Sequence, residues 1–364
     1  MTAKRISAFF LLLILPLALF LLRKNQISIP LISDEGEYAY EANLMAHGAL
    51  PYQDAYDQKP PLVFFIYRFA YWFSRNPLAP RILSFIFSCL TMVFLFLLTP
   101  ETWSPASRLS APAIFSVLSS APLADIFSAN CEMFLILFNV VSIWALLKFW
   151  KNPQRLLWAF IAAQGLECLR EKYRLSARSL AVLIFAVCLY PVIIQSRAYF
   201  YESPLELSKT LLYPNPLFES KLIAEEIRKQ TLPTQKIYIF GSEPEIYIYS
   251  GRESATPYIT SYPLTLFPKN KAQIIRELSR LKNSPPRMIV YCDIAGSQVI
   301  GSTLGIYFRN KIQELLKTRY SLVGKTPVLP NAAPPQFIAE TAFPQFNDTN
   351  TLYLFRLRSA PKGS

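Results

Sequence analysis

Long apolar blocks dominate the first half of the chain. They cover residues 6–22, 62–73, 82–98, 109–127, 133–150, 156–166 and 180–194. A helix that crosses a bilayer needs about 20 apolar residues, with about 17 as a minimum, whereas shorter runs are more often interfacial. The blocks at 62–73 and 156–166 belong to the short class, and the first contains Arg68 among aromatic residues, as interface helices do. We therefore expect a multi-pass α-helical membrane domain with about five spanning helices plus interface helices.

After residue 197 the pattern changes to short apolar runs that alternate with amphipathic ones. The periodicity predicts helices over 221–230, 271–282 and 306–318, and strands over 236–241, 287–293 and 353–358. This alternation is typical of an α/β sandwich of Rossmann-like order. The glycine after the first strand stands alone, without a GxGxxG pattern, so we expect no nucleotide site. The domains are thus 1–196, with an external loop over 25–81, and a soluble α/β domain over 197–364.

Composition and charge support a membrane protein. The 364 residues are 52% hydrophobic and 17% charged, which is more apolar than is usual for a soluble protein. The formal net charge of +13 comes from basic residues that flank the apolar blocks, where they set topology and meet lipid phosphates. The bilayer is therefore the expected partner, and nucleic acid is not. One histidine and no CxxC pair leave no expected metal site or cofactor.

The basic residues also predict the orientation. Lys4 and Arg5 place the N-terminus in the cytoplasm, and no small-x-small cleavage site follows the first block, so we expect a retained anchor. Counting crossings then puts the basic cluster between 148 and 178 inside. The loop over 25–81 and the α/β domain both lie on the extracytoplasmic side.

Unusual polar residues gather in this loop. Its charged residues are Asp34, Glu35, Glu37, Glu41, Asp54, Asp57, Lys59 and Arg81, and Glu132 reaches the same face by the crossing count, with Asp125 deeper. The simplest interpretation of Glu37, Glu41, Asp54 and Asp57 is a solvated loop face. Ser33 or Asp34 is a candidate N-cap for a helix that ends at Gly48.

Several linked motifs carry a family resemblance. DEGEYAYEANLMAHGALPYQDAYDQKPPL (34–62), followed by an apolar run and APRILS (79–84), resembles the first external loop of bacterial lipid-linked-sugar glycosyltransferases. These enzymes are of the protein O-mannosyltransferase and aminoarabinose transferase type and have the membrane GT-C architecture. SANCEMF (128–134) is similar to the family's Ala-Asn-Thr-Glu motif, with Cys131 in place of threonine. KIYIFGSEPEIYIYSGRESATPYITSYPL (236–264) resembles the start of the soluble domain of many members.

The resemblance implies a function and a site. It implies a bacterial inner-membrane enzyme that transfers a sugar, with inversion, from a polyprenyl-phosphate sugar donor to a hydroxyl acceptor on a lipid, glycan or protein. It assigns the catalytic base to Asp34, orientation of the acceptor or base to Glu35 and Glu132, and the donor phosphate to Lys59 and Arg81. Phosphate is already a good leaving group, so no metal is required.

Other interpretations of these residues stay open. Lys59 is also typical of an interfacial anchor, Arg81 of a topology signal, and Glu132 of a hydrogen-bonding residue at a helix N-terminus. Glu243 and Glu245 are either a charge cluster at a helix start or residues that select the acceptor.

The chain also departs from the family pattern. Family members carry several further membrane helices between the glutamate motif and the soluble domain, where this chain has only the blocks at 156–166 and 180–194. The alternative function is therefore a catalytically inactive membrane scaffold or a lipid-phosphate-binding relative. A transporter is disfavoured because no paired interrupted helices occur.

Overall fold

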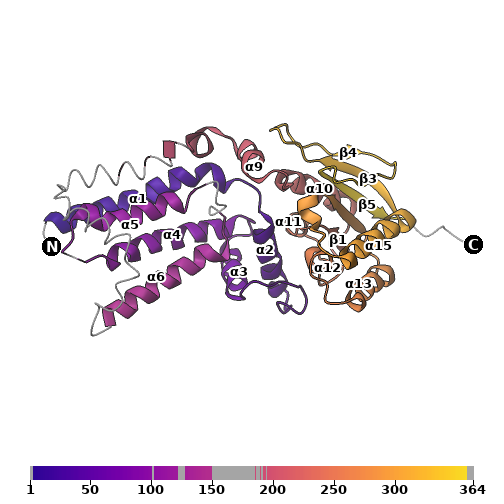
Figure 1. Cartoon of the computed structure of the whole chain (residues 1–364), viewed down its shortest axis with the longest axis horizontal. Helices are drawn as coiled ribbons and strands as arrows, with labels where there is room; N and C mark the ends of the chain where they lie inside the picture. The colour runs from indigo at the N-terminus through magenta and orange to yellow at the C-terminus, as the bar shows by residue number, and fades with distance from the viewer. Residues whose placement is uncertain are drawn as a thin grey trace, which may run out of the picture. The chain divides into compact units, whose positions relative to one another are not determined.

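The chain forms a mostly helical structure with one small mixed sheet (Figure 1). The structure is a computed structural model that describes residues 3–100, 102–121, 128–149, 185, 189, 192–193 and 195–358, with the backbone only for residues 3–13 and 149. The predicted block 156–166, most of 180–194, Asp125 and the basic residues between 151 and 178 lie outside the described residues.

Contacts divide the chain into two compact units. The helical unit comprises Met1–Ser28 and Leu78–Pro204, and the α/β unit comprises Ile29–Pro77 and Leu205–Ser364. This division differs from the sequence-based domains in one respect, because most of the loop predicted over 25–81 packs into the α/β unit. The reason is hydrophobic: Tyr40, Leu44 and Ala55 of that segment are buried in the core of the α/β unit.

Apolar helices build the helical unit. They are α1 (Ala3–Ile27), α4 (Ala79–Leu98), α5 (Pro105–Leu118) and α6 (Cys131–Phe149), followed by the short π-helix η3 (Arg197–Tyr201). Among the described residues, α4 and α6 are long and apolar enough to cross a membrane, by length and composition alone. The helix predicted over 109–127 begins earlier than expected, after the N-cap Ser104, and ends at Leu118. Its 14 residues span about 21 Å, less than the roughly 30 Å of a bilayer core.

A buried arginine connects three parts of the helical unit. The Arg23 side chain, near the end of α1, donates to Ser88 Oγ at 3.2 Å, to Ser119 O at 2.7 Å and to Ser120 Oγ at 3.3 Å. Hydroxyl and carbonyl oxygens thus satisfy a guanidinium that is only 3% exposed. No local sequence pattern indicates this role for Arg23, since its partners are neutral residues far along the chain.

The α/β unit is a three-layer sandwich around a mixed sheet of order β1-β2-β5-β3-β4. Its strands are β1 (Ile237–Phe240), β2 (Met288–Asp293), β3 (Tyr320–Pro327), β4 (Ile338–Ala339) and β5 (Thr351–Leu357). β1 and β2 are parallel, with Ile237 opposite Met288, whereas β5 is antiparallel to both β2 and β3. The expected Rossmann-like order is therefore confirmed only for the first two strands. A parallel neighbour needs a crossover of a dozen or more residues, usually a helix, and no helix lies between β3 and β5.

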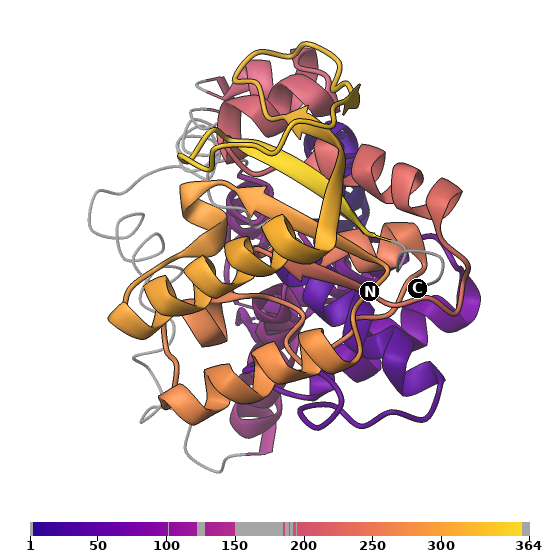
Figure 2. The same ribbon diagram turned by 90° about the vertical axis from the view of Figure 1, so that its right-hand side faces the viewer.

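Helices cover both faces of this sheet. One face packs against α10 (Leu217–Gln230), α11 (Glu245–Ser250) and α2 (Ser33–Ala46), and the other against α13 (Lys271–Asn283) and α15 (Thr303–Arg319). Figure 2 shows α13 and α15 in front of the strands. The remaining helices of the unit are α3 (Leu62–Phe73), α9 (Pro204–Leu212), α12 (Tyr262–Thr265) and α14 (Ala295–Gln298). All six elements predicted beyond residue 197 are present, and α3 has the bounds expected for a helix too short to span.

Candidate functional site

The candidate site begins at the N-terminus of α2. Neither Ser33 nor Asp34 caps this helix, contrary to the expectation: the N-cap is Ile32, and Glu35 Oε2 accepts a hydrogen bond from its N–H at 3.2 Å. Ser33 Oγ instead donates to Ser242 O at 2.7 Å. Glu35 is fully buried and satisfies an N–H that would otherwise lack a partner at the helix start. Its contact positions Asp34, the second residue of the helix.

A glycine lets α2 approach the start of α11 closely. A Cβ atom added at Gly36 would lie 2.6 Å from the backbone nitrogen of Glu245 and 2.9 Å from its Cα. Real Cβ atoms do not come so near to backbone, so any larger residue forces the two helices apart. Gly36, the glycine of the DEGEY motif, therefore allows α2 to pack closely on α11.

Three longer-range hydrogen bonds fix the rest of the segment on the α/β unit. Leu31 N–H donates to the Tyr249 hydroxyl at 2.7 Å, and Ser254 N–H donates to the Tyr40 hydroxyl at 2.8 Å. Further along, Tyr56 N–H donates to Pro257 O at 2.7 Å. The segment from 31 to 56 is thereby bound to the sandwich at both ends and in the middle.

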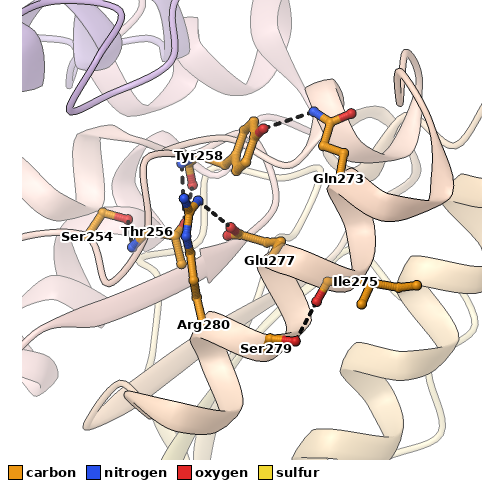
Figure 3. A network of polar contacts seen from close by, with 8 residues as sticks. All are labelled: Ser254, Thr256, Tyr258, Gln273, Ile275, Glu277, Ser279 and Arg280. Carbon is orange, nitrogen blue, oxygen red and sulfur yellow. Dashed lines mark hydrogen bonds and ion pairs between the residues drawn. The ribbon is translucent and has the colours of Figure 1, made fainter.

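The loop that receives Tyr56 is itself held to α13 by a polar network (Figure 3). The Tyr258 hydroxyl accepts from Gln273 Nε2 at 2.9 Å, and Arg280 Nη1 lies 3.5 Å from Glu277 Oε2. The Tyr258 ring lies 5.9 Å from that of Tyr56, within the range of aromatic pairing. Burial raises the pKa of Glu277 to about 6. The loop that binds Tyr56 is therefore itself fixed on the α/β unit.

Two of the predicted site residues meet on this scaffold. Lys59 Nζ lies 2.9 Å from Asp34 Oδ2, with the two side chains 22% and 39% exposed. The Tyr38 hydroxyl donates to the same Asp34 oxygen at 3.4 Å, and Lys59 Nζ lies 5.7 Å from the centre of the Tyr38 ring. The structure thus pairs a carboxylate with an ammonium group at a place that solvent, and hence a ligand, can reach.

A tight turn delivers Lys59 to Asp34. Asp57 Oδ1 accepts hydrogen bonds from the backbone N–H groups of Gln58, at 2.6 Å, and Lys59, at 2.8 Å. The Tyr52 hydroxyl donates to Lys59 O at 2.6 Å. Aspartate commonly shapes turns through such side-chain to backbone bonds. Asp57 and Tyr52 therefore hold the backbone that carries the lysine.

The acids around this pair are not a solvated face, contrary to the expectation. Glu37, Glu41 and Asp57 are 4%, 0% and 5% exposed, and only Asp54 lies at the surface, where it accepts from Leu50 N–H. The prediction failed because α2 is enclosed by the α/β unit and α3, which composition does not reveal.

Burial changes the acid–base behaviour of these groups. Burial, and then repulsion by Asp57 and Asp34, raises the pKa of Glu37 well above its usual value. Burial and repulsion by Asp57 and Asp54 raise the pKa of Glu41 to about 8, and neither of its carboxylate oxygens has a hydrogen-bond partner in the described residues. Burial also raises the pKa of Asp57. Glu41 is therefore mainly protonated at neutral pH.

The other two predicted residues belong to the helical unit. Arg81 is 3% exposed, and its Nη1 donates to Gln26 O and Ile27 O at 3.1 Å each. These carbonyls end α1, where a cation compensates the partial negative charge of the helix terminus. Glu132 is an exposed residue in the first turn of α6.

Glu243 and Glu245 flank Pro244 at the start of α11, and both are buried. Glu243 Oε2 accepts from Ser242 N–H at 2.7 Å and from Ser297 Oγ at 2.8 Å, and Glu245 Oε1 accepts from Ser220 Oγ at 2.7 Å. Burial, followed by repulsion from Glu243, raises the pKa of Glu245 to about 8. The pair lies at a helix start, as one interpretation predicted, but within the sandwich.

Comparison with known proteins identifies no family. No protein-family model, no curated protein and no solved structure matches the chain. In the described residues, no group of three or more histidine, cysteine, aspartate or glutamate side chains is arranged to hold a metal ion. The family resemblance of the motifs stays a prediction.

Proposed function

We propose that this protein transfers a sugar, with inversion, from a polyprenyl-phosphate donor to a hydroxyl acceptor at the extracytoplasmic face of a bacterial inner membrane. The observation that carries the proposal is the 2.9 Å ion pair of Asp34 and Lys59 on the surface of the α/β unit. The motif resemblance independently assigns the base to Asp34 and the phosphate-binding cation to Lys59.

The two groups match the two charges that the reaction must manage. The acceptor oxygen forms a bond to the anomeric carbon while its proton passes to Asp34, and the bond between that carbon and the phosphate oxygen breaks with its electron pair. Lys59 stabilises the negative charge that develops on the departing polyprenyl phosphate. An ammonium group has three N–H donors, so Lys59 can donate a hydrogen bond to Asp34 and to phosphate oxygens at the same time.

The remaining predicted residues take narrower roles. Glu35 acts as a positioning residue, because its carboxylate fixes the helix start that presents Asp34. Glu132 is assigned to orienting the acceptor, since it lies exposed in the first turn of a helix able to cross the membrane. Arg81 Nη1 is engaged by the end of α1, so Lys59 is our principal phosphate ligand.

We propose about five membrane crossings, with the N-terminus in the cytoplasm. The apolar helices α4 and α6 support this topology, as does α3, whose 12 residues match an interface helix. The crossing expected at 109–127 then requires a locally thinned bilayer, because α5 spans only about 21 Å. The first external segment then lies on the same side of the bilayer as the sheet onto which it folds.

The test uses bacterial cells that lack the gene and carry the wild type, Asp34→Asn or Asp54→Asn. Mass analysis measures polyprenyl-phosphate sugars and the sugars of envelope lipids, glycans and proteins. A general base contributes roughly 10²–10⁴-fold to rate, so Asp34→Asn should leave the donor accumulated and the acceptor unmodified. Asp54→Asn makes the same chemical change at an exposed acid of the same segment and should behave as the wild type.

Two results would argue against the proposed function. Equal transfer by the wild type and Asp34→Asn would remove Asp34 from the mechanism. A wild-type protein that binds polyprenyl phosphate but leaves every sugar pool unchanged would favour the alternative, a lipid-phosphate-binding relative without activity.

A further inference from the structure

A groove of about 860 Å³ lies within the α/β unit, between α2, α3, the segment at 75–77 and α11. Ala39, Ala42 and Ala46 of α2 line it, and their spacing places them on one face of that helix. Because these side chains end at Cβ, they leave space that longer residues would fill. Asp34 and Lys59 do not line the groove, so it is separate from the proposed site of transfer.

The α3 wall of the groove is aromatic and exposed. Phe65, Phe69 and Trp72 line it and are 56%, 49% and 83% exposed. They recur at spacings of four and three residues, which brings them to one face of the helix. Several large apolar side chains exposed on one helix face are typical of an interaction site for a membrane or an apolar ligand.

Two arginines give the groove its charge. Arg68 of α3 and Arg75 beyond its end both line the groove and are exposed. Within the described part of the chain neither side chain has a hydrogen bond or ion pair, and no acidic side chain lines the groove. A planar guanidinium binds phosphate oxygens in a bidentate manner, so this charge suits an anionic phosphate.

Chain connectivity places this groove at a bilayer surface. Only Leu78 separates Pro77, which lines the groove, from the first residue of α4, which is long and apolar enough to cross a membrane. Arg75 precedes that helix by four residues, and four residues reach at most about 14 Å. When α4 spans the bilayer, Arg75 must lie at the level of the lipid headgroups.

We propose that the groove binds an anionic phospholipid of the surrounding bilayer. The acyl chain lies against the alanine face of α2 and the aromatic wall of α3, and Arg68 and Arg75 hold the phosphate of the headgroup. The bound lipid attaches the α/β unit to the membrane surface through α3. This inference goes beyond the proposed transfer reaction and requires neither Asp34 nor Lys59.

The experiment counts lipids bound to the purified full-length chain by native mass spectrometry. The probes are phosphatidylglycerol and phosphatidylcholine, offered in equal amounts in detergent. We expect the wild type to retain phosphatidylglycerol in preference, and Arg68→Gln/Arg75→Gln to lose that preference, by about tenfold for each arginine removed. The control Arg228→Gln/Arg276→Gln removes the same charge from exposed positions on α10 and α13 and should bind as the wild type.

A second variant tests the groove apart from its charge. Ala46→Trp fills the α2 side at an exposed position near the end of the helix and should reduce phosphatidylglycerol binding although both arginines remain. Thermal unfolding midpoints establish that each variant is folded.

Three results would overturn the inference: equal retention by the arginine variant and the wild type, equal loss in the control variant, or unchanged binding by Ala46→Trp. Arginine-dependent binding of polyprenyl phosphate that phosphatidylglycerol fails to displace would also overturn it, because the groove would then hold the donor.

Discussion

Asp34 and Glu41 lie on the same helix, two turns apart, and the structure gives them opposite surroundings. Asp34 is partly exposed and bonded to an ammonium group, whereas Glu41 is fully buried and neither of its carboxylate oxygens has a hydrogen-bond partner in the described residues. Asp34 can therefore exchange a proton with a ligand. Glu41 holds its proton at neutral pH and behaves as a polar packing group.

The difference shows that acidic character alone does not identify a catalytic group in this segment. Glu37, Glu41 and Asp57 lie in the same segment as the Asp34–Lys59 pair, and repulsion from neighbouring acids adds to the burial that raises the pKa of each glutamate. A protonated Glu41 carries no charge, so it adds no repulsion to the charged Asp34–Lys59 pair. We therefore expect substitutions at the pair to affect transfer, and substitutions at the buried acids to affect stability and its dependence on pH.

After Asp34→Asn, the largest effect is expected for Lys59→Gln. Removal of one group that stabilises transition-state charge costs about 10²–10³-fold in rate, and the glutamine keeps most of the side-chain volume. The rate of sugar transfer in membranes that contain accumulated donor measures the loss. Lys236→Gln is the matched control, because Lys236 forms an exposed pair with Glu253 in the same unit. An equal loss in both variants would mean that Lys59 acts only as a surface charge.

Glu41→Gln should act on stability and leave transfer nearly unchanged. The folded pKa of about 8 exceeds the ordinary value of 4.5, so the folded state holds the extra proton between these values. The contribution of Glu41 to stability is therefore fully present below pH 4.5 and is lost as pH rises towards 8. The slope for one proton is at most about 1.4 kcal/mol per pH unit.

Thermal unfolding of the detergent-solubilised chain between pH 5 and pH 8 measures this slope. We expect the midpoint to fall with pH less steeply in Glu41→Gln than in the wild type. Glu225→Gln, at an exposed position on α10, should keep the wild-type slope. A wild-type slope in Glu41→Gln would show that water reaches this carboxylate.

The sequence predicted those features that depend on neighbouring residues. The length of an apolar block located α3, and amphipathic periodicity, which repeats over short stretches, located α13 and α15. The strand β3 was missed, although the residues after α15 alternate between buried and partly buried, because Lys325 and Pro327 weaken its strand signal. The motifs named Asp34 and Lys59 as site residues, but the ion pair between them, 25 residues apart, was not predicted.

Features that depend on distant packing were not predicted. Burial of Glu37 and Glu41 requires α2 to dock on the α/β unit, and one of the bonds that fixes it joins Tyr40 to Ser254 across 214 residues. Arg81 presents the same difficulty, since its carbonyl partners end a helix 54 and 55 residues earlier. No local sequence pattern predicts such contacts.

The smallest effect is expected for Gly36→Ala. This substitution should affect both Asp34 and Glu41. Alanine favours a helix over glycine by about 1 kcal/mol, but its Cβ would meet backbone of α11 at 2.6 Å, and overpacking of this kind costs about 1–3 kcal/mol. We expect a net loss of about 1 kcal/mol in unfolding free energy. Because α2 carries both Asp34 and Glu41, its displacement should also weaken transfer and flatten the pH slope.

Gly296→Ala is the matched substitution. Gly296 lies in α14, has no heavy atom within 4 Å of an added Cβ and does not have a positive φ, so alanine there should be neutral or stabilise by up to about 1 kcal/mol. Denaturant unfolding compares the two variants. A lower unfolding free energy in Gly36→Ala, together with a higher one in Gly296→Ala, would support our explanation. It would show that close docking of α2 on α11 holds the exposed pair and the buried acids in their different environments. Stabilisation by both would mean that α2 is free to shift, and the contrast between Asp34 and Glu41 would then need another cause.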